Sequence, residues 1–86
     1  MEPVIQNTAL RNIELFMGNL ERNLPLVFDR DTATRMLGGI LGKKTLANAD
    51  SAGNGPAVKL KIGKKVMYEK ASFMEWLKSK IRADTQ

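Results

Sequence analysis

The stretch that decides the fold runs from Val58 to Tyr68 and reads VKLKIGKKVMY. Apolar and charged residues alternate on both sides of a Gly-Lys pair, and an alternation with period two is typical of a half-buried β-strand. Two such runs around a short glycine-containing turn predict a β-hairpin over residues 58–69. We expect one face of the hairpin to be apolar and the other to be basic. The apolar face would carry Val58, Leu60, Ile62, Val66 and Tyr68, and the basic face Lys59, Lys61 and Lys65, with Lys64 at the tip.

Two short helices are predicted before this hairpin. Residues 30–37 form the first, which Asp29 can cap with its side chain. Gly38 and Gly39 end it, because glycine tolerates the left-handed conformation that follows many helices. A tight turn then leads to the second helix, over residues 43–51. Two short helices joined in this way predict a helix-turn-helix pair.

Longer helices are predicted on both sides of this region. Apolar residues recur at spacings of three and four from Thr8 to Leu24, which predicts an amphipathic helix that Pro25 ends. A closing helix is expected over residues 71–82, with Phe73, Trp76 and Leu77 on its inner face. We expect residues 1–7 and 83–86 to be irregular. The predicted organisation is an N-terminal helix, residues 1–24, and one compact unit, residues 25–86, that contains the helix pair and the hairpin.

Composition excludes several classes of protein. The 86 residues include no cysteine and no histidine. Disulfides, zinc fingers, iron–sulfur sites and thiol nucleophiles are thereby ruled out, and the commonest general base and metal ligand is missing. We therefore expect no enzymatic activity, cofactor, metal or small-molecule ligand. No apolar run is long enough to span a membrane and no secretory signal opens the sequence, so we expect a cytoplasmic protein without membrane contact.

The positive charge is concentrated in the second half of the chain. The net charge is +5, of which residues 1–42 contribute −1 and residues 43–86 contribute +6. A basic region on a small domain indicates a polyanionic partner, most often nucleic acid. The alternative is that the charge serves only solubility.

Together the elements predict a mostly α protein with a small β-hairpin: a winged helix-turn-helix preceded by an amphipathic N-terminal helix. In this module the second helix of the pair enters the major groove and lysines contact phosphates. The candidate recognition-helix residues are Lys43, Lys44, Thr45, Asn48 and Ser51, and the candidate wing residues are Lys59, Lys61, Lys64 and Lys65.

The chemistry of these candidates is suited to DNA contacts, but each group also has an explanation that does not involve DNA. Asparagine can pair with adenine and threonine can contact a thymine methyl group. The helix residues could equally form a solvated face, and lysines at a sheet edge also prevent aggregation. Asp50 would repel phosphate, so we expect it to point elsewhere or to pair with a lysine.

Two segments resemble a known family. Residues 29–39, DRDTATRMLGG, resemble the opening helix of the excisionase-type, MerR-like winged-helix family. Residues 61–68, KIGKKVMY, followed by residues 73–77, FMEWL, resemble its closing signature, and the similarity covers about residues 26–82. Family members often open the recognition helix with Ser-Pro, whereas this chain has Gly42-Lys43.

The resemblance implies a sequence-specific double-stranded DNA-binding protein, an excisionase-like recombination directionality factor that bends DNA. Its further partners would be a recombinase or a second copy of itself. A small transcriptional regulator of a mobile element, using the same DNA face, is the alternative. A protein-interaction adaptor that uses the N-terminal helix is a further alternative from a different class. An RNA-binding module is less favoured, because the aromatic residues fall on the apolar side of their elements.

Overall fold

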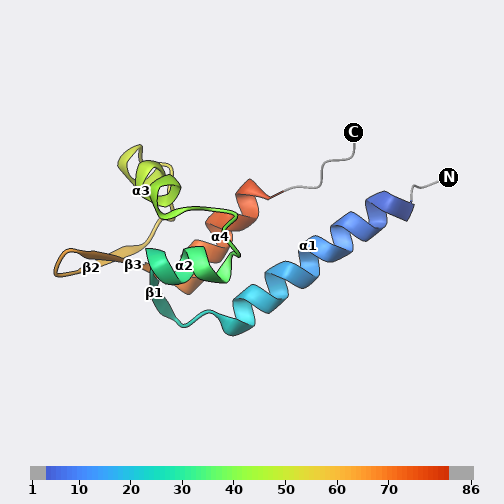
Figure 1. The fold of residues 1–86 in the computed structure, drawn as a ribbon, viewed down its shortest axis with the longest axis horizontal. Coiled ribbons are helices and arrows are strands. Elements are labelled where there is room, and N and C mark those ends of the chain that lie inside the picture. The colour runs from blue at the N-terminus through green and yellow to red at the C-terminus, as the bar shows by residue number, and fades with distance from the viewer. Residues whose placement is uncertain (1–3, 82–86) are drawn as a thin grey trace.

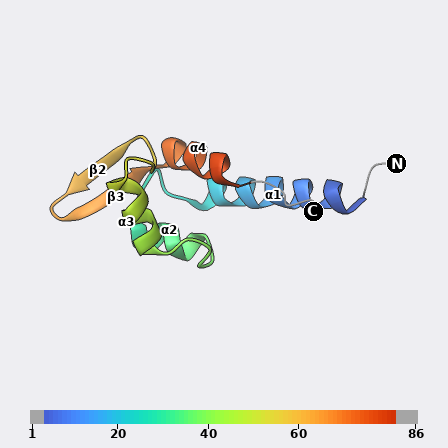
Figure 2. The same cartoon turned by 90° about the horizontal axis from the view of Figure 1, so that it is seen from above.

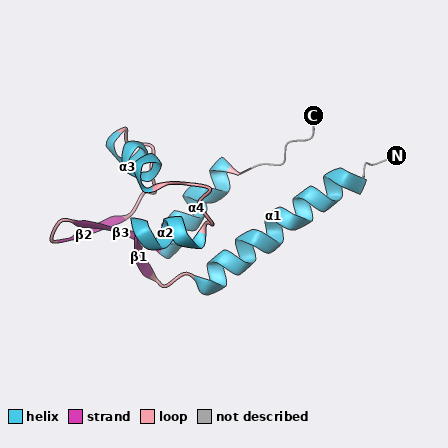
Figure 3. Cartoon of the chain, viewed as in Figure 1, coloured by secondary structure: helices cyan, strands magenta, loops and turns pink. Residues whose placement is uncertain are grey.

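The computed structural model describes residues 4–81, which form four helices and a three-stranded antiparallel sheet (Figures 1 and 3). The elements in chain order are α1 (Val4–Asn23), β1 (Val27–Asp29), α2 (Arg30–Met36), α3 (Lys43–Ser51), β2 (Lys59–Ile62), β3 (Lys65–Glu69) and α4 (Lys70–Lys80). The predicted fold class is confirmed. The chain is mostly α-helical, and the α2–α3 pair followed by the β2–β3 hairpin has the layout of a winged helix-turn-helix. We call residues 59–69 the wing.

Local signals define the α2–α3 region as predicted. The carboxylate of Asp29 caps α2 by accepting a hydrogen bond from a first-turn backbone N–H at 2.9 Å. Gly38 and Gly39 follow α2 with φ of 66° and 84°, a conformation that other residues adopt only at a cost. With both ends of the turn defined, α3 begins at the predicted Lys43 and ends at the predicted Ser51.

Three aromatic rings form the centre of the core. Phe28 of β1, Tyr68 of β3 and Phe73 of α4 are at most 2% exposed. Their ring centroids lie between 5.0 and 6.1 Å apart. Trp76 packs on Phe73 and donates its Nε1–H to the carbonyl of Asn54 at 2.7 Å. The predicted core positions of Tyr68 and Phe73 are thereby confirmed, and Trp76 packs half-buried against the core as predicted. The other buried apolar residues come from all four helices: Leu20, Leu24, Ala33, Leu37, Leu46, Met74 and Leu77.

The predicted apolar face of the hairpin is wrong. The register places Lys59 opposite Tyr68, and residues directly opposite each other share one face of a sheet. The loop between the two strands has two residues, so each even-numbered residue of one strand lies directly opposite an odd-numbered residue of the other. The lysine side of β2 therefore shares the inner face with Tyr68. The apolar residues Leu60 and Ile62 lie on the outer face, where they are 45% and 65% exposed, and Val58 before the strand is 45% exposed.

Strand β1 was not predicted. It pairs with β3, so the sheet has the order β1-β3-β2 and β3 is the central strand. A backbone hydrogen bond of 2.9 Å from Lys70 N to Leu26 O continues this pairing beyond the strand. Strand β1 therefore ties the end of α1 to the start of α4.

The ends of the outer helices also differ from expectation. Helix α1 begins at Val4, so the predicted irregularity of residues 1–7 is wrong for residues 4–7. Helix α4 covers Lys70–Lys80 rather than residues 71–82. Residues 1–3 and the predicted irregular tail 83–86 lie outside the described residues, as does Arg82.

The molecule is elongated, with extents of 54 × 26 × 20 Å. Helices α2 and α3 and the wing lie at one end, and α1 runs beside α4 toward the other (Figure 2). Among residues 4–81, no helix combines the length and the hydropathy that a bilayer crossing requires.

Candidate nucleic-acid interface

Helix α3 presents a polar face to solvent. Leu46 points into the core and is completely buried. All five predicted recognition-helix residues are exposed: Lys43, Lys44, Thr45, Asn48 and Ser51. The helix is preceded by Gly42, which has no side chain to cap it. The first-turn N–H groups of α3 therefore remain open to an acceptor from outside.

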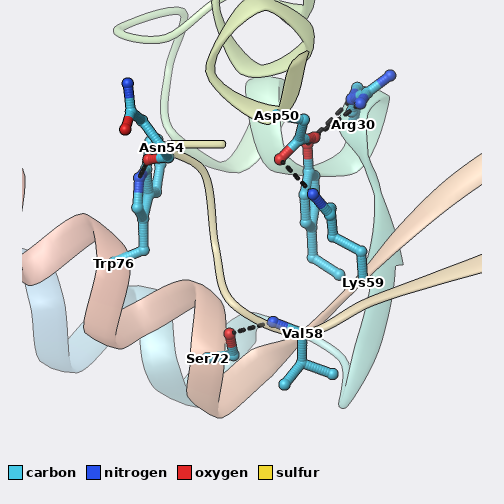
Figure 4. A network of polar contacts seen from close by, with 8 residues as sticks. Arg30, Asp50, Asn54, Val58, Lys59, Ser72 and Trp76 are labelled. Carbon is cyan, nitrogen blue, oxygen red and sulfur yellow. Dashed lines mark hydrogen bonds and ion pairs between the residues drawn. The ribbon is translucent and has the colours of Figure 1, made fainter. Parts of the chain in front are cut away.

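A hydrogen-bonded cluster fixes α3 against α2 and the sheet (Figure 4). Arg30, the first residue of α2, donates from Nη2 to Asp50 Oδ2 at 2.7 Å and from Nε to Tyr68 Oη at 2.9 Å. The hydroxyl of Tyr68 in turn donates to Asp50 Oδ2 at 2.7 Å. Lys59 of the wing approaches the other carboxylate oxygen, Oδ1, at 3.5 Å. One carboxylate thus joins α2, α3, β2 and β3.

The electrostatics of the cluster favour charged Asp50. Burial alone would raise the pKa of Asp50, but hydrogen bonds from Arg30 and Tyr68 outweigh it and hold that pKa below its usual value. Burial and the hydrogen bond to Asp50 raise the pKa of Tyr68 to about 12, so the phenol stays a donor. The expectation that Asp50 points away or pairs with a lysine is confirmed, since its charge is taken up inside the protein.

Gly55 leaves the space that the carboxylate of Asp50 occupies in the cluster. A Cβ atom at position 55 would clash with Asp50 Oδ1 and lie within 3.3 Å of its backbone N. Any other residue would therefore force Asp50 or the backbone at position 55 to move. The glycine-rich segment after α3 therefore does more than end the helix.

The inner face of the wing and α3 border a shallow groove of about 270 Å³. Lys59 and Lys61 line its wing side, and Asp50 and Arg30 line its helix side. At the far end of the wing, Gly63 takes a φ of 62°, which the first loop position of a type II′ hairpin requires. Lys64 follows it at the tip and is exposed. The structure thus brings Lys59 and Lys61 close to α3, while Lys64 lies further out.

The six lysines among the nine candidate residues differ in how their charges are engaged. Three lysines form ion pairs: Lys43 with Asp31 at 2.9 Å, Lys59 with Asp50 at 3.5 Å and Lys65 with Asp29 at 3.1 Å. Within the described residues, Lys44, Lys61 and Lys64 form none. These three exposed ammonium groups are the ones most open to phosphate.

Sequence reasoning missed Arg30 as part of the site. It was expected only as the first residue of a helix, and no local pattern links it to Asp50 or Tyr68. The sequence did indicate that Asp50 needs a cationic partner, because it is a lone aspartate on a polar helix beside a basic hairpin, but it did not indicate which residue that partner is. The described residues contain no group of three or more acidic side chains suited to a metal ion.

Comparisons with known proteins add no relatives. No protein-family model matches the chain, and searches against curated proteins and solved structures return no match. The function must therefore be argued from the site itself.

Proposed function

We propose that this protein binds double-stranded DNA, with α3 in the major groove and the wing on the neighbouring backbone. One observation carries the proposal: an exposed polar face on α3 is held beside a lysine-rich wing by the hydrogen bonds and the ion pair around Asp50. The cluster orients α3 and the wing in the free protein. Binding DNA would therefore require little further ordering of these elements, and the entropy cost of binding would be small.

Within this proposal the residues have different roles. Thr45 and Asn48 are the candidates for contacts to base edges. Lys44, Lys61 and Lys64 neutralise phosphates and release counterions. Lys43 and Lys65 contribute less, because each exchanges an existing ion pair for a phosphate contact.

The finer role that we propose is that of an excisionase-like recombination directionality factor. It is supported by the resemblance of residues 29–39, 61–68 and 73–77 to that family. Regulation of transcription by the same DNA face is the alternative. Selection of bound sequences from random duplexes, followed by mapping of the preferred site to recombination sites or to promoters, separates the two.

The DNA proposal is tested by fluorescence anisotropy of labelled duplex DNA across a salt series. We expect non-specific binding with a dissociation constant of about 10⁻⁴–10⁻⁶ M near physiological salt. The variant Lys61→Ala/Lys64→Ala should make the plot of log affinity against log salt shallower by about 1 per lysine removed.

The matched control is Lys78→Ala/Lys80→Ala, which removes the same charge from α4 at the other side of the molecule. It should leave the salt slope nearly unchanged. Absence of duplex binding at low salt, or an equal loss of slope in both double variants, would contradict the proposed interface.

A further inference from the structure

A second surface lies at the end of the molecule away from the wing. Helices α1 and α4 run side by side (Figure 2) and leave between them an open groove of about 570 Å³. Its apolar lining comes from both helices: Ile13, Met17, Met74 and Ile81. Ile13, Met17 and Ile81 are only half-buried. Flexible methionines are common at surfaces that accept apolar side chains of a partner.

The rim of this groove is acidic, in contrast to the rest of the protein. Among the residues that the structure describes, Glu14 and Glu21 of α1 and Glu75 of α4 line it, opposed by one cation, Lys78. All three glutamates are exposed, and none forms an ion pair within the described residues. The described lining therefore carries a net charge of −2 on a chain whose net charge is +5.

Glycine shapes the groove as well. Gly18 lies on its α1 wall, and a Cβ atom there would meet only the flexible end of Arg22, at 3.5 Å. The sequence thus keeps open a position where a better helix former would fit without strain, at a cost of roughly 1 kcal/mol to the helix. The open wall is what lets another helix approach closely.

We propose that the α1/α4 groove binds a basic amphipathic helix of a protein partner. Apolar side chains of that helix would fill the apolar lining, and its lysines or arginines would pair with Glu14, Glu21 and Glu75. The negative charge of the groove favours a basic helix over other occupants. A second copy of the groove would oppose like charges, and nucleic acid would be repelled by the carboxylates. The inference goes beyond DNA binding and does not depend on it.

The probe is a synthetic helix of about 18 residues with leucine at i, i+3, i+4 and i+7 and lysine elsewhere. The comparison peptide has the same leucines with glutamate in place of lysine. Anisotropy of the labelled peptides and amide chemical shifts of the isotope-labelled protein are measured without DNA. We expect the lysine peptide to bind with a dissociation constant below about 100 µM and the glutamate peptide not to bind. The shifts should concentrate on the facing sides of α1 and α4.

Three variants locate the site. Glu14→Gln/Glu21→Gln/Glu75→Gln changes only exposed side chains and should weaken the lysine peptide by roughly fivefold or more. Gly18→Gln should block the groove while helix propensity preserves the fold. Asp31→Asn, which removes a carboxylate at the other end of the molecule, is the control and should leave the affinity unchanged.

The opposite outcomes overturn the proposal. These are equal binding of the two peptides, no binding of either, unchanged binding by Gly18→Gln, or shifts confined to the exposed apolar face of the wing. A concentration-dependent dimer in analytical ultracentrifugation that tightens in the triple glutamine variant would assign the groove to a second copy instead.

Discussion

At the scale of single residues, Asp50 decides how α3 meets the rest of the protein. Its side chain is 8% exposed and accepts hydrogen bonds from a guanidinium and a phenol. A carboxylate in this position satisfies the buried phenol of Tyr68 and the guanidinium of Arg30, whose side chain is 26% exposed, and an apolar replacement would leave the phenol without this acceptor. Asp50 is therefore a positioning residue for the proposed DNA face, although it is on the helix proposed to touch DNA.

Replacing Asp50 tests this role. We expect Asp50→Ala to lower the free energy of unfolding by about 1–3 kcal/mol, because Arg30 and Tyr68 lose their acceptor. Urea unfolding followed by circular dichroism measures the change. The control is Asp31→Asn, whose ion pair with Lys43 is more than half exposed on both sides and should contribute less than about 1 kcal/mol. Equal losses in the two variants would mean that the cluster does not hold α3.

Asp29 gives the fold a dependence on pH. A backbone hydrogen bond from Thr32 and the ammonium group of Lys65 lower the pKa of Asp29 to about 2. The unfolded value is about 3.9, so the unfolded chain binds more protons between these values. Stability should be constant above about pH 5 and fall as the pH drops toward 2, and the lowered pKa of Asp50 acts in the same direction.

Urea midpoints between pH 2 and pH 6 would measure this trend. In Asp29→Asn the curve should be flatter, because asparagine keeps the cap of α2 without a titrating group. A variant that loses stability over the same pH range as steeply as the original chain would show that Asp29 is not responsible.

At the scale of elements, a lysine of α4 closes the end of α1. Lys70 donates from Nζ to the carbonyl of Glu21 at 2.7 Å and to that of Leu24 at 3.2 Å. These are carbonyls of the last turn of α1 and just beyond it, where unpaired acceptors favour a cation. The contact fixes α1 beside α4, in addition to the burial of Leu20 and Leu24.

We expect Lys70→Met to reduce the free energy of unfolding by about 1 kcal/mol, since methionine keeps the apolar stem and loses both hydrogen bonds. Lys80→Met changes an exposed lysine of the same helix and should have an effect within about 0.5 kcal/mol. Thermal unfolding of both variants compares them directly. A larger effect at position 80 would contradict the capping role.

The elements also show which parts of this fold can be predicted from sequence. Helices with local end signals were predicted correctly, as at Asp29 and Gly38. Strand β1 was missed because it has three residues and exists only by pairing with β3, far along the chain. The hairpin was located correctly, but its faces were not. The Gly-Lys loop pairs residue 62 with residue 65, so even-numbered residues of β2 share a face with odd-numbered residues of β3, whereas the prediction kept even-numbered residues of both strands on one face. All nine candidate residues are exposed as expected, whereas the Arg30–Asp50–Tyr68 cluster needs the fold to bring it together.

At the scale of the whole molecule, charge and shape divide the protein into two ends. One end carries α3 and the wing with their lysines, and the other carries the α1/α4 groove with its glutamates. The Cα radius of gyration is 14.3 Å, whereas a compact domain of this length would have about 12 Å. An extended shape of this kind would let the proposed DNA and the proposed partner helix bind at once without contact between them.

The elongation predicts uneven stability along α1. Arg11, Asn12, Glu14 and Leu15 are exposed, whereas Leu20 and Leu24 belong to the core. Segments with few buried contacts open at low free energy. Native-state hydrogen exchange should therefore show amides of residues 16–23 protected at least about tenfold more than those of residues 8–15, since tenfold corresponds to only 1.4 kcal/mol.

The same measurement links this prediction to the groove. The lysine peptide should raise the protection of residues 13–21 of α1, because a bound helix adds contacts there, while protection of α3 stays unchanged. Uniform protection along α1 in the free protein would mean that its first half is held by contacts other than those with α4. The groove would then already be occupied within the chain, and a partner helix would have to displace those contacts before it could bind.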